Sequence, residues 1–143
     1  MSTLTEQEQH TLAAIADYLI PEAEGMPAAS QVNVATELAE RVFSVRHDLV
    51  DLVKGALAKV PGLDGEVAAK KLAEIDPAGF HAITTVASAG YFMSPVTRKA
   101  LGYPGQESRP FDPDKTTEYL HDGLLQPVID RGPIYMPTPE QRA

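Results

Sequence analysis

The feature that most constrains this chain is a stretch from Pro77 to Thr97 that carries no formal charge. Asp76 and Pro77 open it, with Asp at the N-cap position and proline at the first helical position, which is a strong helix-start signal. The stretch contains His, Thr and Ser side chains and two prolines, so it is a poor membrane span despite its length. A helix that is apolar over most of its circumference is normally the buried centre of a bundle. The sequence therefore predicts such a helix from Pro77 to about Phe92.

Helix start and stop signals recur on both sides of this segment. Thr5 and Glu8 form a T-x-x-E capping box, and Leu4 is placed to act as a hydrophobic staple. Other residues have the chemistry of N-caps (Asp48, Asp64, Ser94) or of helix stops (Pro21, Pro61, Gly102). Apolar residues recur at helical spacing between these signals, and no run has the period of a strand. The patterns predict an all-α fold, a small bundle of about six helices, over residues 5–20, 35–46, 48–60, 64–75, 77–92 and 95–101.

The character of the chain changes beyond Gly102. Residues 94–143 hold eight of the 12 prolines, and residues 80–143 hold seven of the nine aromatic residues. The formal charge is −7 over residues 1–79 and −1 over residues 80–143. A weak helix is predicted from Lys115 to His121, or further to Ile129, and the proline-rich end is expected to be irregular. We expect a single domain, 1–143, that divides into a helical bundle, 1–102, and an extended proline-rich arm, 103–143.

Composition and motifs exclude several classes of function. The 143 residues fit one domain, and without cysteine the chain has no disulfide, no thiolate metal site and no cysteine nucleophile. A net charge of −8 argues against nucleic-acid binding, because phosphate contacts need clustered Lys and Arg. No nucleotide-binding glycine motif and no serine-nucleophile motif occurs. Glu118 and His121 form one Glu-x-x-His pair, whereas a di-iron bundle needs two, so we expect no metal site.

The most informative stretch runs from Gly90 to Gln106. It predicts a buried helix, a tight corner, a short helix and a Gly-Tyr-Pro-Gly turn, in which Gly102 is free to take a positive φ. Two interpretations of Tyr103, at the tip of this turn, stay open. It packs back on the core, or it is an exposed aromatic anchor on a rigid loop, as is typical of an interface.

Three blocks of residues together carry a family resemblance. The first is Leu4-Thr5 with Leu12 through Pro21, and the second is Gly90-Tyr91-Phe92 followed by Arg98 and by Leu101 through Gly105. The third is Leu124, Val128 and Arg131 through Tyr135, which is similar to a closing pattern V-x-x-R-G-P-I-[YW]. In this order and spacing the blocks span nearly the whole chain. The chain thereby resembles the gluconate 2-dehydrogenase subunit 3 family.

The resemblance implies a non-catalytic accessory subunit. Members of this family typically accompany a large FAD-dependent dehydrogenase of the glucose–methanol–choline type, which oxidises a sugar or another alcohol, and they support its folding, stability or export in a chaperone-like way. The chain is then expected to carry no catalytic residue and no cofactor, with FAD in the partner subunit. Many members carry a twin-arginine signal, which does not precede the first helix here, so we expect a cytoplasmic complex without membrane insertion.

The residues expected to contact the partner lie in the near-neutral, aromatic part of the chain. They are Tyr91, Phe92, Arg98, Tyr103, Pro104, Phe111, Tyr119, Arg131, Pro133 and Tyr135. Two rival hypotheses stand beside this one. The chain is an independent enzyme or small-ligand binder with a pocket lined by His81, Tyr91 and Tyr103, or it is a regulatory interaction module unrelated to dehydrogenases.

Overall fold

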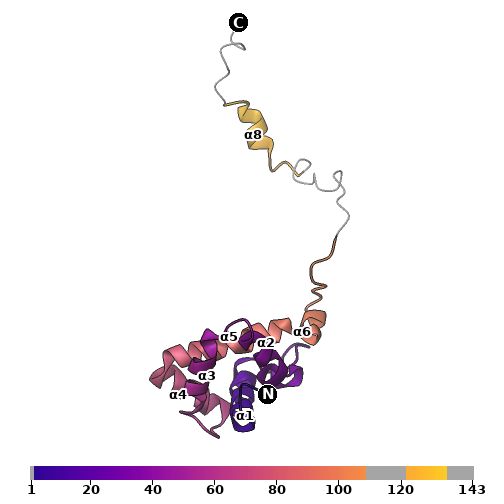
Figure 1. The fold of residues 1–143 in the computed structure, drawn as a ribbon. Coiled ribbons are helices and arrows are strands. Elements are labelled where there is room, and N and C mark those ends of the chain that lie inside the picture. The colour runs from indigo at the N-terminus through magenta and orange to yellow at the C-terminus, as the bar shows by residue number, and fades with distance from the viewer. Residues whose placement is uncertain (1, 109–121, 135–143) are drawn as a thin grey trace. The chain divides into compact units, whose positions relative to one another are not determined.

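The computed structural model describes residues 2–108 and 122–134. The chain separates into two compact units, Met1–Gly105 and Gln106–Ala143. Figure 1 shows the helices of the first unit, which are α1 (Glu6–Leu19), η1 (Ser30–Val32), η2 (Val34–Leu38), α2 (Ala39–Phe43), α3 (Asp48–Leu57), α4 (Gly65–Ile75), α5 (Pro77–Met93) and α6 (Pro95–Ala100). The second unit contains α8 (Gln126–Arg131). The described residues form helices and no strand, which confirms the all-α prediction.

Local hydrogen bonds at the predicted N-caps fix where four of these helices begin. At α1, Thr5 Oγ1 accepts from the Glu8 backbone N–H at 3.3 Å, and a Glu8 carboxylate oxygen accepts from the Thr5 N–H at 2.7 Å. The side chains of Asp64, Asp76 and Ser94 likewise accept backbone N–H groups in the first turns of α4, α5 and α6. These contacts satisfy donors that have no partner within the helix.

The predicted cap of α3 is wrong. His47 occupies the N-cap position and makes no side-chain cap, while Asp48 is already the first residue of α3. The Asp48 carboxylate instead accepts two hydrogen bonds from the Arg46 guanidinium, at 2.9 Å and 2.7 Å. The bidentate pair with a residue two positions earlier therefore takes the oxygen atoms that a cap would use.

The second predicted helix does not begin as an α-helix. Its first part, η2, is a π-helix, in which the Leu38 N–H donates to the Asn33 carbonyl at 3.3 Å. Asn33 itself is left-handed, with φ 60° and ψ 35°, and links η2 to the 3-10 turn η1. The helix becomes regular only at α2.

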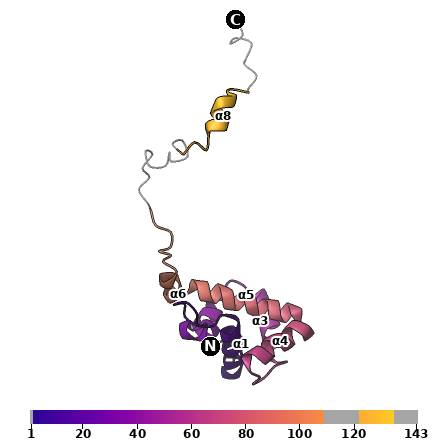
Figure 2. The ribbon, with the colours of Figure 1, turned by 180° about the vertical axis from the view of Figure 1, so that it is seen from behind.

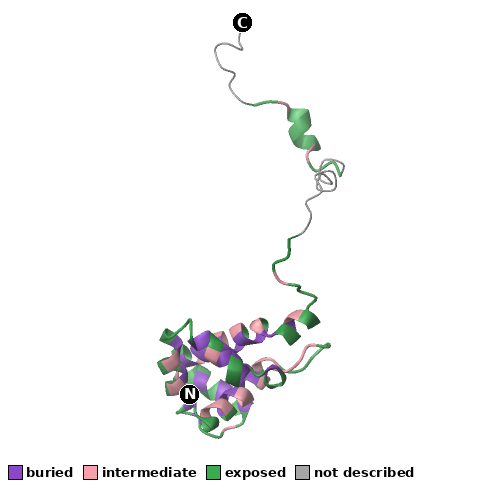
Figure 3. Cartoon of the chain, turned by 45° about the vertical axis from the view of Figure 1, so that its right-hand side comes forward, coloured by how far each residue is buried: buried purple, intermediate pink, exposed green. Residues whose placement is uncertain are grey.

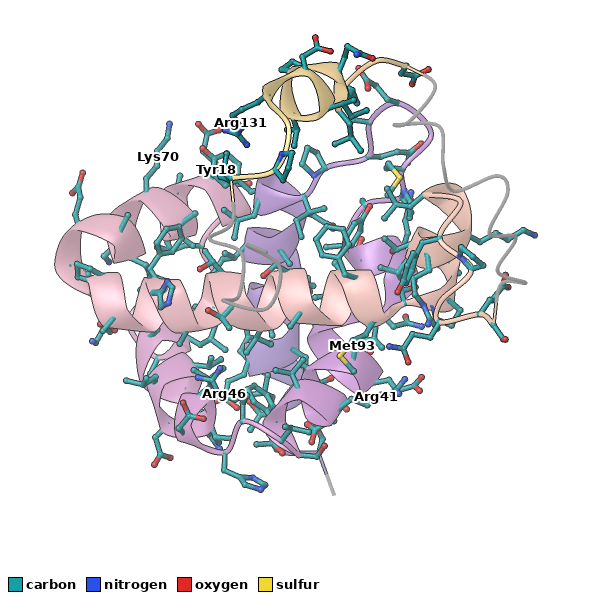
Figure 4. All side chains as sticks on the ribbon, turned by 90° about the horizontal axis from the view of Figure 1, so that it is seen from above. Tyr18, Arg41, Arg46, Lys70, Met93 and Arg131 are labelled. Carbon is teal, nitrogen blue, oxygen red and sulfur yellow. The ribbon has the colours of Figure 1, made fainter. Side chains whose placement is uncertain are left out.

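Two clusters of buried side chains form the core of the first unit. The larger cluster contains side chains from α1, η2, α2, α3, α4 and α5. The smaller cluster contains side chains from the end of α1, from η1 and η2, and from the second half of α5. Met93 packs against both clusters (Figure 4). On the other side of the core, Tyr18 of α1 and Lys70 of α4 lie on neighbouring helices (Figure 4).

The α5 helix packs against α1 to α4 but does not occupy the centre of the bundle. It runs along one side of the first unit, and only one of its faces is buried (Figures 2 and 3). On its outer face the hydroxyls of Thr84, Thr85 and Ser88 donate to carbonyls one turn earlier. These uncharged side chains satisfy their donors locally, which is why a helix without charge retains a solvated face.

Candidate functional site

The predicted corner between α5 and α6 is a hydrogen-bonded, mostly exposed element, which we call the α6 corner (residues 92–104). Ser94 ends α5 and caps α6, with its Oγ accepting from the backbone N–H groups of Val96 and Thr97. Gly102 ends the helix with φ 66° and donates to the Lys99 carbonyl. The Tyr103 N–H donates to the Arg98 carbonyl at 2.9 Å. These two bonds are a Schellman motif, so both ends of the short helix are fixed by hydrogen bonds.

Large apolar side chains gather in the α6 corner without being buried. They are Phe92, Val96, Leu101 and Tyr103, each between 52% and 57% exposed. Residues 2–91 expose only five such side chains over a segment several times as long. The sequence left open whether Tyr103 packs on the core or is exposed on the loop. The structure shows an exposed ring. Exposed apolar side chains concentrated in one short segment, aromatic residues among them, are typical of a protein interface.

Tyr91 does not belong to this surface, although the sequence suggested it as a partner contact. Its side chain is 3% exposed and its hydroxyl donates to the Pro27 carbonyl at 2.7 Å. Its ring meets Phe92 edge-to-face, with centroids 5.6 Å apart and an interplanar angle of 80°. Tyr91 thus faces the core, because successive side chains of a helix point about 100° apart, and its ring contacts the exposed Phe92 ring.

A shallow depression of about 390 Å³ lies at the C-terminal end of α6. Its lining consists of Pro95, Arg98, Lys99, Gly102, Tyr103 and Pro104. Two cations therefore flank an exposed tyrosine. Among the described residues, no carboxylate pairs with either cation, and the buried Arg98 Nε has no hydrogen-bond partner. The predicted contacts Arg98, Tyr103 and Pro104 are thus brought together.

In the second unit α8 is exposed along its whole length (Figure 3). The predicted contact residues Arg131 and Pro133 are exposed. So are four large apolar side chains, Leu124, Val128, Ile129 and Ile134, at 52% to 76%. The predicted contacts Phe111, Tyr119 and Tyr135, and the predicted helix from Lys115 to His121, lie outside the described residues.

The three residues of the rival pocket do not line one cavity. His81 borders a depression of about 350 Å³ together with Leu19, Ile20, Thr84, Thr85, Ala87 and Ser88. Tyr103 borders the depression of the α6 corner, and Tyr91 is buried. His81 and Tyr91 are ten positions apart on α5, which separates their Cα atoms by about 15 Å along the helix axis.

Among the described residues, the titratable groups with shifted pKa values lie away from the α6 corner. The Lys59 ammonium, 2.7 Å from Asp76 Oδ2, and the Gly79 N–H lower the pKa of Asp76. Asp48 and Arg46 shift each other in the directions expected of an ion pair. Within the described residues, no group of three His, Asp or Glu side chains is placed to hold a metal ion. The single Glu118 and His121 pair lies outside them.

Comparison of the chain with protein-family models, curated proteins and solved structures found no match. In residues 2–108 and 122–134, no helix combines the length and the apolar character needed to cross a bilayer.

Sequence reasoning missed three residues of the α6 corner, Val96, Lys99 and Leu101. The predicted short helix from 95 to 101 included all three, but its length gives fewer than two turns, too few for periodicity to assign a buried face. One signal in the sequence did indicate that Val96 is exposed. The predicted helix has no second large apolar residue three or four positions from Val96 with which it could form a buried face.

Proposed function

We propose that this chain is a non-catalytic accessory subunit that binds and stabilises an FAD-dependent oxidoreductase of the glucose–methanol–choline type. The family resemblance supplies the identity of the partner. The observation that carries the proposal is the concentration of exposed apolar side chains in the α6 corner. Three of these side chains, Phe92, Leu101 and Tyr103, lie in the second of the three blocks on which the resemblance rests.

The geometry of the corner supports binding rather than chemistry. Both ends of the α6 helix are closed by hydrogen bonds, and the exposed Phe92 ring contacts the buried Tyr91 ring. Surfaces that are ordered before binding lose less conformational entropy in the complex. Aromatic and arginine side chains are also the residues that most often carry binding energy.

The exposed second unit is the other part of the proposed contact surface. Its six-residue helix α8 buries no side chain, and helices this short are unstable in isolation. We infer that the apolar side chains of residues 124–134 become covered when the chain binds the flavoprotein. Proline lowers the entropy lost when such a segment becomes ordered.

The direct test is affinity purification of the tagged chain from its native host, with flavin absorbance and mass spectrometry of the captured protein. We expect an FAD-containing oxidoreductase in stoichiometric amount. The double variant Phe92→Ser with Tyr103→Ser is expected to lose most of it. The control Val67→Ser removes an apolar side chain that is equally exposed, at 53%, on α4. It is expected to retain the partner.

Two outcomes contradict the proposal. Recovery of partners without flavin favours the regulatory module, and substrate turnover by the purified chain alone favours the independent enzyme. A truncation that lacks residues 123–143 tests the second unit separately. Undiminished co-purification of the flavoprotein by that truncation contradicts its part in the interface.

A further inference from the structure

The α6 corner lies in the longest stretch of the sequence without an acidic residue. From Pro77 to Gln106 the sequence contains no Asp or Glu, and its Lys and Arg residues are Arg98 and Lys99. The formal charge of this segment is therefore +2, in a chain of −8. Both cations border the same depression as Tyr103. The corner is a positive, aromatic patch on an acidic protein.

Within the first unit, neither Arg98 nor Lys99 has an ion-pair partner. No described carboxylate lies within ion-pair distance of either side chain. On the neighbouring side of Pro95 and Val96, a separate depression is bordered by Glu37 and Arg41, whose charges cancel. Within the first unit, no neighbouring side chain therefore neutralises the positive charge of Arg98 and Lys99.

We propose that the α6 corner docks on an apolar surface of the flavoprotein that is rimmed by Asp and Glu side chains. This inference rests on the proposed function and specifies the chemistry of the partner. Phe92, Val96 and Tyr103 supply the apolar contact, while Arg98 and Lys99 select an acidic rim. Complementary charges at an interface speed association and exclude partners of the same sign.

A second copy of this chain is the alternative occupant, since residues 1–79 carry −7. A contact between the corner of one copy and the acidic part of another is heterologous, because two different surfaces meet. Such a contact produces a ring or an open filament rather than a closed pair. Binding of the flavoprotein, by contrast, gives a finite complex that needs neither a ring nor a filament.

The experiment compares Lys99→Glu with Lys71→Glu. Both substitutions reverse one exposed lysine and change the net charge by the same amount, but Lys71 lies on α4, away from the patch. The probe is the flavoprotein recovered with the wild-type chain, and its affinity for each chain is measured by titration calorimetry. We expect Lys99→Glu to weaken binding about tenfold at low salt, and Lys71→Glu to leave it unchanged. Raising NaCl from about 0.1 M to about 1 M shortens the Debye length from about 10 Å to about 3 Å. The higher salt is expected to weaken wild-type binding and to reduce the difference between the variants.

The outcomes separate this inference from the proposed function. If both variants bind the flavoprotein as tightly as the wild type, the acidic docking surface is refuted while the accessory function stands. If the wild-type chain captures no flavoprotein, the proposed function fails and the inference fails with it. A concentration-dependent increase in the mass of the purified chain, abolished by Lys99→Glu, assigns the patch to self-association and overturns the inference.

Discussion

The close approach of α4 to α1 makes Gly65 a sensitive position in the fold. A Cβ atom at this residue lies 2.0 Å from the carbonyl oxygen of Ala14 and 2.6 Å from its carbonyl carbon. Close contacts between carbon and carbonyl oxygen have separations of about 3.3 Å or more, so Gly65→Ala forces the helices apart by more than about 1 Å. Both obstructing atoms are backbone atoms, which cannot rotate away as a side chain does. Overpacking costs about 1–3 kcal/mol, and we expect this variant to reach the upper end of that range.

Gly55→Ala is the matched control. It makes the same chemical change on an exposed face of α3, where an added Cβ meets no atom within 4 Å. Alanine is the better helix former, so this variant is expected to gain about 0.5–1 kcal/mol. Thermal unfolding followed by circular dichroism measures both changes. A loss of about 3 kcal/mol lowers the Tm of a domain of this size by roughly 10–20 °C. A Gly65→Ala protein with the Tm of the wild type would refute the close packing of α1 on α4.

Three further predictions concern single contacts. The Lys59 ammonium lowers the pKa of Asp76 below its usual value of 3.8, so its stabilising effect is present above that pH and is lost as the pH falls through the lower folded-state value. Below pH 4, the Tm of Asp76→Asn is therefore expected to fall less steeply than that of the wild type, and parallel curves would contradict the ion pair. Tyr91→Phe removes the donor to the Pro27 carbonyl and is expected to cost about 1 kcal/mol in urea denaturation; an unchanged midpoint would contradict that bond. Burial acts to raise the pKa of Glu40, but hydrogen bonds from Thr3 and Ser2 outweigh it, so an NMR titration is expected to give a value below 4.5.

The helix starts that the sequence predicted correctly are those whose signals are local. Thr5, Asp76 and Ser94 cap helices because each binds an N–H group within three residues of itself. The cap predicted at Asp48 failed for a reason that is equally local, since a bidentate arginine competed for the same oxygen atoms. Sequence reasoning at this range succeeds when one residue has one available partner.

The features that the sequence did not reveal depend on distant parts of the chain. The Tyr91 hydroxyl finds its acceptor 64 positions away, so its position in an apolar pattern indicated neither burial nor exposure. The close approach of Gly65 to Ala14 joins two helices that are far apart in the sequence. The π-helical start at Val34 follows a left-handed Asn33, and periodicity at 3.6 residues does not distinguish such a turn from an α-helix.

The exposed side chains of the α6 corner contribute little to the stability of the first unit. Thr97 is the only buried residue of α6, and hydrogen bonds close its two ends, to the Ser94 hydroxyl at the start and to the carbonyls of Arg98 and Lys99 at the end. Substitution of Phe92, Tyr103 or Lys99 therefore removes little of the buried area that holds the first unit together. We expect these variants to unfold within about 0.5 kcal/mol of the wild type, as exposed substitutions usually do. A loss of flavoprotein binding at unchanged stability then reports on the contact itself, whereas a parallel loss of stability would show that the corner is part of the core.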